Sequence, residues 1–93
     1  MFERILFQMR EKIRLRQYVM TIHAEEEMDE DGMRIFDVES IVLSGSIVER
    51  QKDSFTGKWK YIVKGDTLSE SSAIVVAKLS PTGKLVIVTV FCE

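Results

Sequence analysis

Residues 73–91 read AIVVAKL-SPTG-KLVIVTVF, and the remainder of the chain has to pair with this segment or cover it. β-branched residues dominate both arms, which favours pleated strands over helix. Pro81 presets φ for the first corner of a turn, while Ser80 and Gly83 suit the positions on either side of it. The segment therefore predicts a β-hairpin. Because both faces of each arm are apolar, neither arm is expected at a half-wet edge of a sheet.

Two further strands are predicted upstream of the hairpin. Residues 58–64 alternate between lysine and apolar or aromatic side chains, which is the period of a pleated strand. Residues 47–51 form a shorter candidate strand, and the turn between the two closes with Gly57. With the hairpin, these strands predict a four-stranded antiparallel meander.

Helical spacing dominates the first half of the chain. Residues 2–15 carry a stripe of Phe2, Ile5, Leu6, Met9 and Ile13, which predicts an amphipathic helix. Packing of this stripe on the sheet is the simpler interpretation. A membrane-surface or partner-binding helix is the alternative, since its polar face leans basic.

Two more helices are predicted before the strands begin. The first spans residues 22–31, with Thr21 as its cap and Gly32 at its end, and the second spans residues 34–43. The segment 17–20 between the helices is too short to classify and is compatible with a brief edge strand. The predicted fold class is α+β, with N-terminal helices followed by the four-stranded antiparallel sheet.

Length and composition narrow the class of protein. A chain of 93 residues is expected to form one domain, 1–93. The single cysteine, Cys92, excludes an internal disulfide and fits a reducing compartment. No apolar run approaches the ~18 residues of a membrane span, and the N-terminus lacks a signal-peptide pattern. A cytoplasmic location away from membranes is therefore expected.

Charge is segregated along the chain. Residues 21–40 hold eight acidic side chains against one basic, whereas residues 41–64 hold five basic against two acidic. This pattern predicts an acidic patch and a basic patch.

The basic patch is expected on the central strands. Lys58, Lys60 and Lys64 share one face of their strand, and Arg50 and Lys52 have the matching parity on the strand before it. Together they could form a strip of cations that binds phosphates. An ordinary solvated sheet face is the simpler interpretation.

His23 is the one histidine, and Glu27 and Glu30 follow it on the same helix face. A histidine–carboxylate pair could transfer protons near neutral pH or contribute metal ligands. A partly buried structural histidine is the simpler interpretation. Because no cysteine–histidine pattern, phosphate loop or nucleophile elbow is present, we expect no metal and no cofactor.

The acidic segment 25–31 leads to a separate hypothesis, which is binding of a protein partner. Glu26, Glu27 and Glu30 are the candidates for recognition by a basic protein partner.

A set of positions from residue 17 to the end forms a pattern: Tyr18, Thr21, His23-Ala24, Met28, Gly32, Asp37-Val38, Gly45, residues 61–65 and the final strand 86–91. This pattern resembles the bacterial family called domain of unknown function 4258. The resemblance divides the chain into an N-terminal helix, 1–16, and a family-like core, 17–93. It implies the architecture of RelE-like and MqsR-like ribonuclease toxins. It also implies a cognate antitoxin of zinc-finger or helix-turn-helix type.

The same resemblance implies site residues and a function. His23 matches the family histidine, Thr89 the final-strand threonine and Tyr61 the aromatic residue of the second strand; with Lys60 they are the candidate catalytic residues. Metal-free cleavage of messenger RNA, on or off the ribosome, is the first hypothesis, with Arg50, Lys52, Lys58 and Lys64 binding the substrate.

The departures from the family pattern support an alternative. Relatives commonly carry arginine where this chain has Glu27 and Asp31, and often tyrosine where it has Phe91. A toxin fold that has lost catalysis and docks a basic partner through its acidic helix is the second hypothesis. A homodimer joined through the N-terminal helix is a third.

Overall fold

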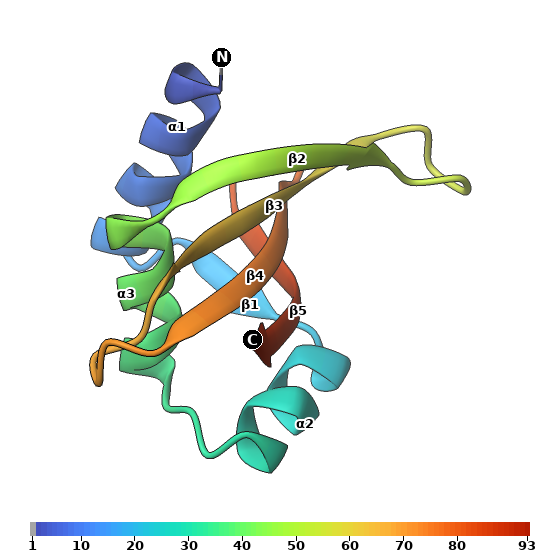
Figure 1. The fold of residues 1–93 in the computed structure, drawn as a ribbon. Coiled ribbons are helices and arrows are strands. Elements are labelled where there is room, and N and C mark those ends of the chain that lie inside the picture. The colour runs from blue at the N-terminus through green and yellow to red at the C-terminus, as the bar shows by residue number, and fades with distance from the viewer. Residues whose placement is uncertain (1) are drawn as a thin grey trace.

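The structure is a computed structural model that describes residues 2–93 as three helices and five strands (Figure 1). In chain order they are α1 (Glu3–Arg14), β1 (Tyr18–Met20), α2 (Ile22–Glu30), α3 (Ile35–Ser44), β2 (Ser46–Lys52), β3 (Trp59–Asp66), β4 (Ser72–Leu79) and β5 (Leu85–Cys92). Met1, which belongs to the predicted segment 1–16, lies outside the described residues. The α+β class and the position of the helices ahead of the meander are as predicted.

The sheet has the strand order β1-β5-β4-β3-β2. Strands β2 to β5 form the expected antiparallel meander, and β4 and β5 are the predicted hairpin. The prediction of a four-stranded, purely antiparallel sheet is wrong, because β1 pairs parallel with β5 between Tyr18↔Leu85 and Met20↔Ile87. Three residues show no usable periodicity, and their partner lies at the far end of the chain. The segment 17–20 was compatible with a brief edge strand, and β1 lies at the edge of the sheet; its parallel pairing with β5 could not be read from local sequence.

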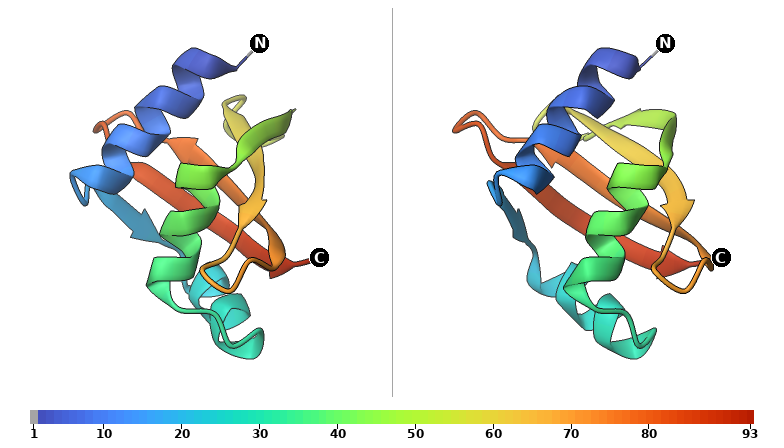
Figure 2. Two further views of the ribbon diagram at one scale, coloured as in Figure 1. Left: turned by 60° about the vertical axis from the view of Figure 1, so that its left-hand side comes forward. Right: turned by 90° about the vertical axis from the view of Figure 1, so that its left-hand side faces the viewer.

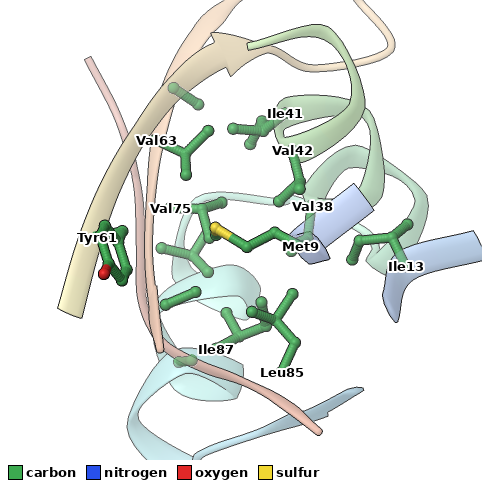
Figure 3. Packing of buried hydrophobic residues seen from close by; sticks show 14 of the residues in the cluster. Met9, Ile13, Val38, Ile41, Val42, Tyr61, Val63, Val75, Leu85 and Ile87 are labelled. Carbon is green, nitrogen blue, oxygen red and sulfur yellow. The ribbon is translucent and has the colours of Figure 1, made fainter. Parts of the chain in front are cut away.

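Helices α1 and α3 cover one side of the sheet, and the core lies between them and the strands (Figures 2 and 3). The largest fully buried side chains are Met9, Ile41, Leu85, Ile87, Val38, Val42, Val63, Val75 and Val90. Met9 and Ile13 come from the stripe of α1, so the N-terminal helix packs into the fold, as the simpler interpretation expected. Burial of each such side chain contributes about 1.5–3 kcal/mol.

Two glycines let the end of α3 approach β3 closely. A Cβ added at Gly45 would lie 2.8 Å from the carbonyl carbon of Lys64, and one added at Gly65 would lie 2.9 Å from the Cα of Gly45. Backbone fills the space on both sides, so neither position can hold a larger residue without moving an element. This contact fixes the height of α3 on the sheet.

Within residues 2–93, no helix combines the length and apolar character needed to cross a membrane.

Candidate functional site

The side of the sheet opposite α1 and α3 carries no helix among the described residues (Figures 1 and 2). Strand register defines which side chains point there, since paired residues share a face and neighbours alternate. On β3, β4 and β5 they are Lys60, Ile62, Lys64, Ile74, Val76, Lys78, Val86, Thr89 and Phe91. We call these nine residues the open face. Its centre is the row in which Ile62 pairs with Val76 and Val76 pairs with Thr89.

Two of the predicted cations and one unpredicted cation lie on the open face. Lys60 and Lys64 are on β3, as expected, and Lys78 joins them from β4. Lys58 lies before β3 in the connecting turn, where its backbone N–H donates to Thr56 Oγ1 at 3.2 Å. The parity of Lys78 with Val76 in a period-two strand was the signal that could have added it to the candidates.

Arg50 and Lys52 lie on the other side of the sheet, so the expectation of one strip of five cations is wrong. Arg50 pairs with Tyr61 and Lys52 with Trp59, and the guanidinium carbon of Arg50 is 4.0 Å from the Trp59 ring centroid. The cause is a β-bulge at Val48, between the pairs Ile47↔Val63 and Glu49↔Ile62.

The bulge decides which residue of β2 faces Lys60. Regular pairing from Ile47↔Val63 onward would place Arg50 opposite Lys60. With the extra residue, Lys60 instead pairs with Gln51. The basic side chains are thereby divided between the two faces.

The lysine amines of the open face differ in whether a carboxylate lies close enough to form an ion pair. Lys64 Nζ lies 3.2 Å from Glu93 Oε1, and the hydrogen bond from Ser72, followed by that from Lys64, lowers the pKa of Glu93. Lys60 and Lys78 make no ion pair within residues 2–93, although their charges act on Asp53. The pKa of Asp53 is lowered mainly by the backbone N–H groups of Phe55 and Thr56. Lys60 and Lys78 are therefore the two amines of the open face that have no ion-pair partner among residues 2–93.

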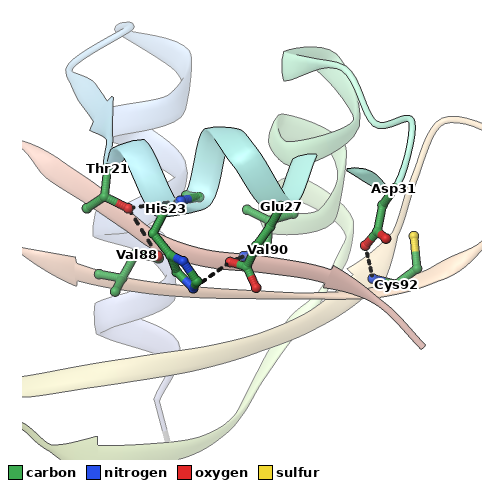
Figure 4. A network of polar contacts seen from close by, with 8 residues as sticks. Thr21, His23, Glu27, Asp31, Val88, Val90 and Cys92 are labelled. Atoms are coloured by element: carbon green, nitrogen blue, oxygen red, sulfur yellow. Dashed lines mark hydrogen bonds and ion pairs between the residues drawn. The ribbon is translucent and has the colours of Figure 1, made fainter. Parts of the chain in front are cut away.

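Helix α2 places His23 beside the outer edge of β5 (Figure 4). Thr21 caps the helix as predicted, accepting from Ala24 N at 3.1 Å and donating to the carbonyl of Val88 at 3.1 Å. His23 Nε2 lies 3.3 Å from Glu27 Oε1, and the imidazole is 67% exposed while the Glu27 side chain is 23% exposed. The predicted histidine–carboxylate pair with Glu27 is therefore present, in a position open to solvent.

The two acidic departures from the family pattern complete the hydrogen bonding of β5. Pairing with β1 ends at Ile87, and beyond it Glu27 Oε1 accepts from Val90 N at 3.2 Å and Asp31 Oδ2 from Cys92 N at 3.1 Å (Figure 4). A guanidinium has no acceptor, so arginine at either position could not make these bonds. Glu27 and Asp31 thus accept hydrogen bonds from β5 where no neighbouring strand does so.

The four predicted catalytic residues are divided among three places. Lys60 and Thr89 share the open face. Tyr61 is nearly buried on the opposite face, where its ring stands edge-on to Phe2 at 6.2 Å between centroids. His23 is separated from β3 by β5 and β4, and no hydrogen bond or ion pair in the described part of the chain links it to a lysine.

The acidic helix residues are also divided. Glu27 is turned toward β5, whereas Glu26 and Glu30 are exposed and have no ion pair among residues 2–93. Glu25 and Asp29 extend this exposed acidic side. Across the same residues, no group of three or more His, Cys, Asp or Glu side chains converges in a way that could hold a metal ion.

Comparison with known proteins adds a family. The family model described as "Domain of unknown function (DUF4258)" matches residues 20–92, which include α2, α3 and the whole meander. No curated protein and no solved structure matches the chain.

Proposed function

The chain belongs to the DUF4258 family, and from that premise we propose that it is a metal-independent ribonuclease of the RelE-like toxin type that binds RNA on its open face. The observation that carries the proposal is the pair Lys60 and Lys78 on a helix-free sheet surface, without ion-pair partners among the described residues. Such amines bind the phosphates of an extended strand. Phe91, 40% exposed on the same face, offers a ring on which a base can stack.

The order of the elements suggests a path for the substrate. From β2 outward, Lys60 on β3 is followed by Lys78 on β4, which pairs with Val86 on β5. Thr89 lies in a neighbouring row, paired with Val76, and α2 with His23 packs against β5. An RNA strand that begins at the two amines would run obliquely across β4 and β5, past Thr89, to reach the imidazole. The distance from β3 to β5 is about two strand spacings, or roughly 10 Å.

The chemistry proposed on this path is transesterification within the RNA. A base removes the proton of a ribose 2′-hydroxyl, the 2′-oxygen attacks the adjacent phosphorus, and the bond to the 5′-oxygen breaks. The products are a 2′,3′-cyclic phosphate and a 5′-hydroxyl that takes up a proton. His23, paired with Glu27, is the candidate for the proton transfers, and Lys60 for stabilising the charge on phosphorus.

Binding and cleavage can be tested separately with a short labelled single-stranded RNA in buffer containing EDTA. Lys60→Ala/Lys78→Ala should weaken binding and reduce the slope of log affinity against log salt by about 0.7 for each phosphate that the variant no longer neutralises. Lys12→Ala, a cation on α1, serves as the matched control and should leave both unchanged. Unaltered affinity of the double variant would exclude the open face as the RNA site.

His23→Gln should abolish cleavage and leave RNA affinity unchanged. A substrate with a 2′-deoxyribose at the cleaved position should bind and remain intact. Cleavage that persists in His23→Gln would remove the imidazole from the mechanism, and RNA binding without any cleavage would leave an RNA-binding domain of the same fold.

A second function is favoured by the exposed acidic side of α2. We propose as the alternative that Glu26 and Glu30, which lack cation partners among residues 2–93, dock a basic protein such as the product of an adjacent antitoxin gene. Glu26→Lys/Glu30→Lys should abolish a salt-sensitive complex with that product. Glu27 is left unchanged, because it bonds β5. A complex that survives the reversal would contradict this alternative.

A further inference from the structure

A groove runs along the outer side of α3, on the helix-bearing layer of the molecule. Its volume is about 420 Å³, and it is lined by Phe36, Glu39, Ser40, Leu43, Ser44 and Leu68. We infer that this groove binds an amphipathic helix of a protein partner, with a basic residue of that helix facing Glu39. The inference does not depend on the proposed ribonuclease activity.

The apolar side chains of the groove have no role in the core. Phe36 is 53% exposed, Leu43 40% and Leu68 67%. The opposite side of α3, formed by Val38, Ile41 and Val42, provides its contribution to the core. Phe36, Ser40 and Leu43 follow the helical spacing i, i+4, i+7, so they form one stripe. Exposed aromatic and leucine side chains in such a stripe are typical anchors for a partner helix.

The wall opposite α3 is held in place before any partner binds. Ser40 Oγ donates to the carbonyl of Asp66 at 2.8 Å, and Asp66 N donates to Ser44 Oγ at 3.2 Å. Leu68 N donates to Asp37 Oδ1 at 3.0 Å, which fixes the backbone that carries the exposed Leu68 side chain. A groove with fixed walls loses little conformational entropy on binding, so more of the contact energy appears as affinity.

Charge specifies the occupant. Among the described residues, Glu39 is the one charged side chain that lines the groove; one of its oxygens accepts from Tyr18 Oη, and the other makes no hydrogen bond within that part of the chain. The bordering segments, residues 34–44 and 66–71, hold the four carboxylates Asp37, Glu39, Asp66 and Glu70 against the single cation Arg34. A lysine or arginine within an apolar helix stripe complements this surface.

The position of the groove separates it from the open face. α3 packs on the covered side of the sheet, so a helix along its outer side would leave Lys60, Lys78 and Thr89 accessible (Figure 2). The groove is also distinct from the exposed acids of α2, which belong to another element.

The test is selection from a displayed library of amphipathic helical peptides against the intact protein. Selected helices should carry leucine or aromatic residues at i, i+3 or i+4, and i+7, with lysine or arginine within or beside that stripe. Phe36→Ala should weaken their binding at least tenfold. Glu39→Gln, whose amide oxygen can still accept from Tyr18, should weaken it roughly three- to tenfold and reduce its salt dependence.

Matched controls distinguish the groove from other surfaces. Phe7→Ala, which removes a 61% exposed ring from α1, should leave peptide affinity unchanged. Peptides with glutamate in place of the basic residue should bind Glu39→Lys better than the parent protein, and thermal melting establishes that each variant is folded. Failure to select any helix, or equal binding by Phe36→Ala, would overturn the inference. A dimer that Phe36→Ala dissociates would show that the groove is covered by a second copy instead.

Discussion

At the scale of single residues, Glu27 supplies a hydrogen-bond acceptor that a neighbouring strand would otherwise provide to β5. Its carboxylate accepts from Val90 N, and Val90 itself is fully buried. Glu27→Ala should lower the free energy of unfolding by about 1–3 kcal/mol, because a buried N–H loses its acceptor. Glu27→Gln keeps an acceptor oxygen and should lose less. Urea unfolding monitored by circular dichroism measures both, and equal stability of all three proteins would show that water replaces the carboxylate at no cost.

Tyr18 provides a second test at this scale. Burial, then the hydrogen bond to Glu39 and its charge, raise the pKa of Tyr18 from 10.0 to about 12. Because the folded state favours the protonated phenol, the resulting stability is complete below pH 10 and is lost as the pH rises toward 12. Titration of tyrosinate absorbance should show a component near this pKa that disappears in Tyr18→Phe. A titration curve unchanged by Tyr18→Phe would contradict this assignment.

At the scale of elements, the basic side chains lie on both faces of the sheet, and this predicts which face governs RNA affinity. Arg50 and Lys52 lie on the side of Trp59 and Tyr61, so Arg50→Ala/Lys52→Ala should leave RNA affinity within about twofold, as for surface changes away from a site. Lys60→Ala/Lys78→Ala removes the same number of charges from the open face and should reduce affinity strongly. Equal reductions in the two double variants would mean that net charge, rather than the open face, governs binding.

The glycine pair gives a prediction for the contact between α3 and β3. Gly65→Ala should destabilise the protein by about 3 kcal/mol, since the added methyl group meets backbone and not a movable side chain. This corresponds to a fall in melting temperature of roughly 12–24 °C for a domain of this size. Gly32→Asn is the control, because nothing lies within 4 Å of the added Cβ and asparagine tolerates its φ of +67°. A melting temperature of Gly65→Ala close to that of the control would show that α3 can move away.

Sequence patterns revealed those elements whose signal is local. The hairpin around Pro81 and Gly83 and the cap at Thr21 depend on neighbouring residues, and both are present. The brief edge strand considered at residues 17–20 is present as β1. Its parallel pairing with β5 and the bulge at Val48 depend on partners distant in the chain, and neither of these was predicted. For the candidate site, His23 and Glu27 were paired correctly by helical spacing. The separation of Lys60 from Arg50 followed from register, which the sequence of one strand does not contain.

At the scale of the whole molecule, the two sides of the sheet differ in how they are covered. α1 and α3 cover one side, and Met9 of α1 is completely buried in the core between the helices and the sheet. Met9→Ala should cost about 2–5 kcal/mol of unfolding free energy. Removing residues 1–15 would therefore unfold the protein rather than test the hypothesis of a homodimer through α1. Phe7→Ser, which changes only the outer side of α1, is the suitable variant, and sizing of that variant against the parent protein decides the hypothesis.

The carboxylates of Glu27 and Asp31 also have a consequence for pairing between folded copies, because they occupy backbone N–H groups at the edge of β5. Beyond Ile87, Glu27 and Asp31 already occupy the edge of β5. On the same side of the sheet, β1 exposes an edge of only three residues. Among the described strands, β2 therefore has the one long edge with which a neighbouring molecule could pair. Molecules with one free sheet edge can pair only as dimers, whereas molecules with two free edges can pair repeatedly and form a fibre. We therefore expect the hydrogen bonds accepted by Glu27 and Asp31 to hinder end-to-end polymerisation through β5.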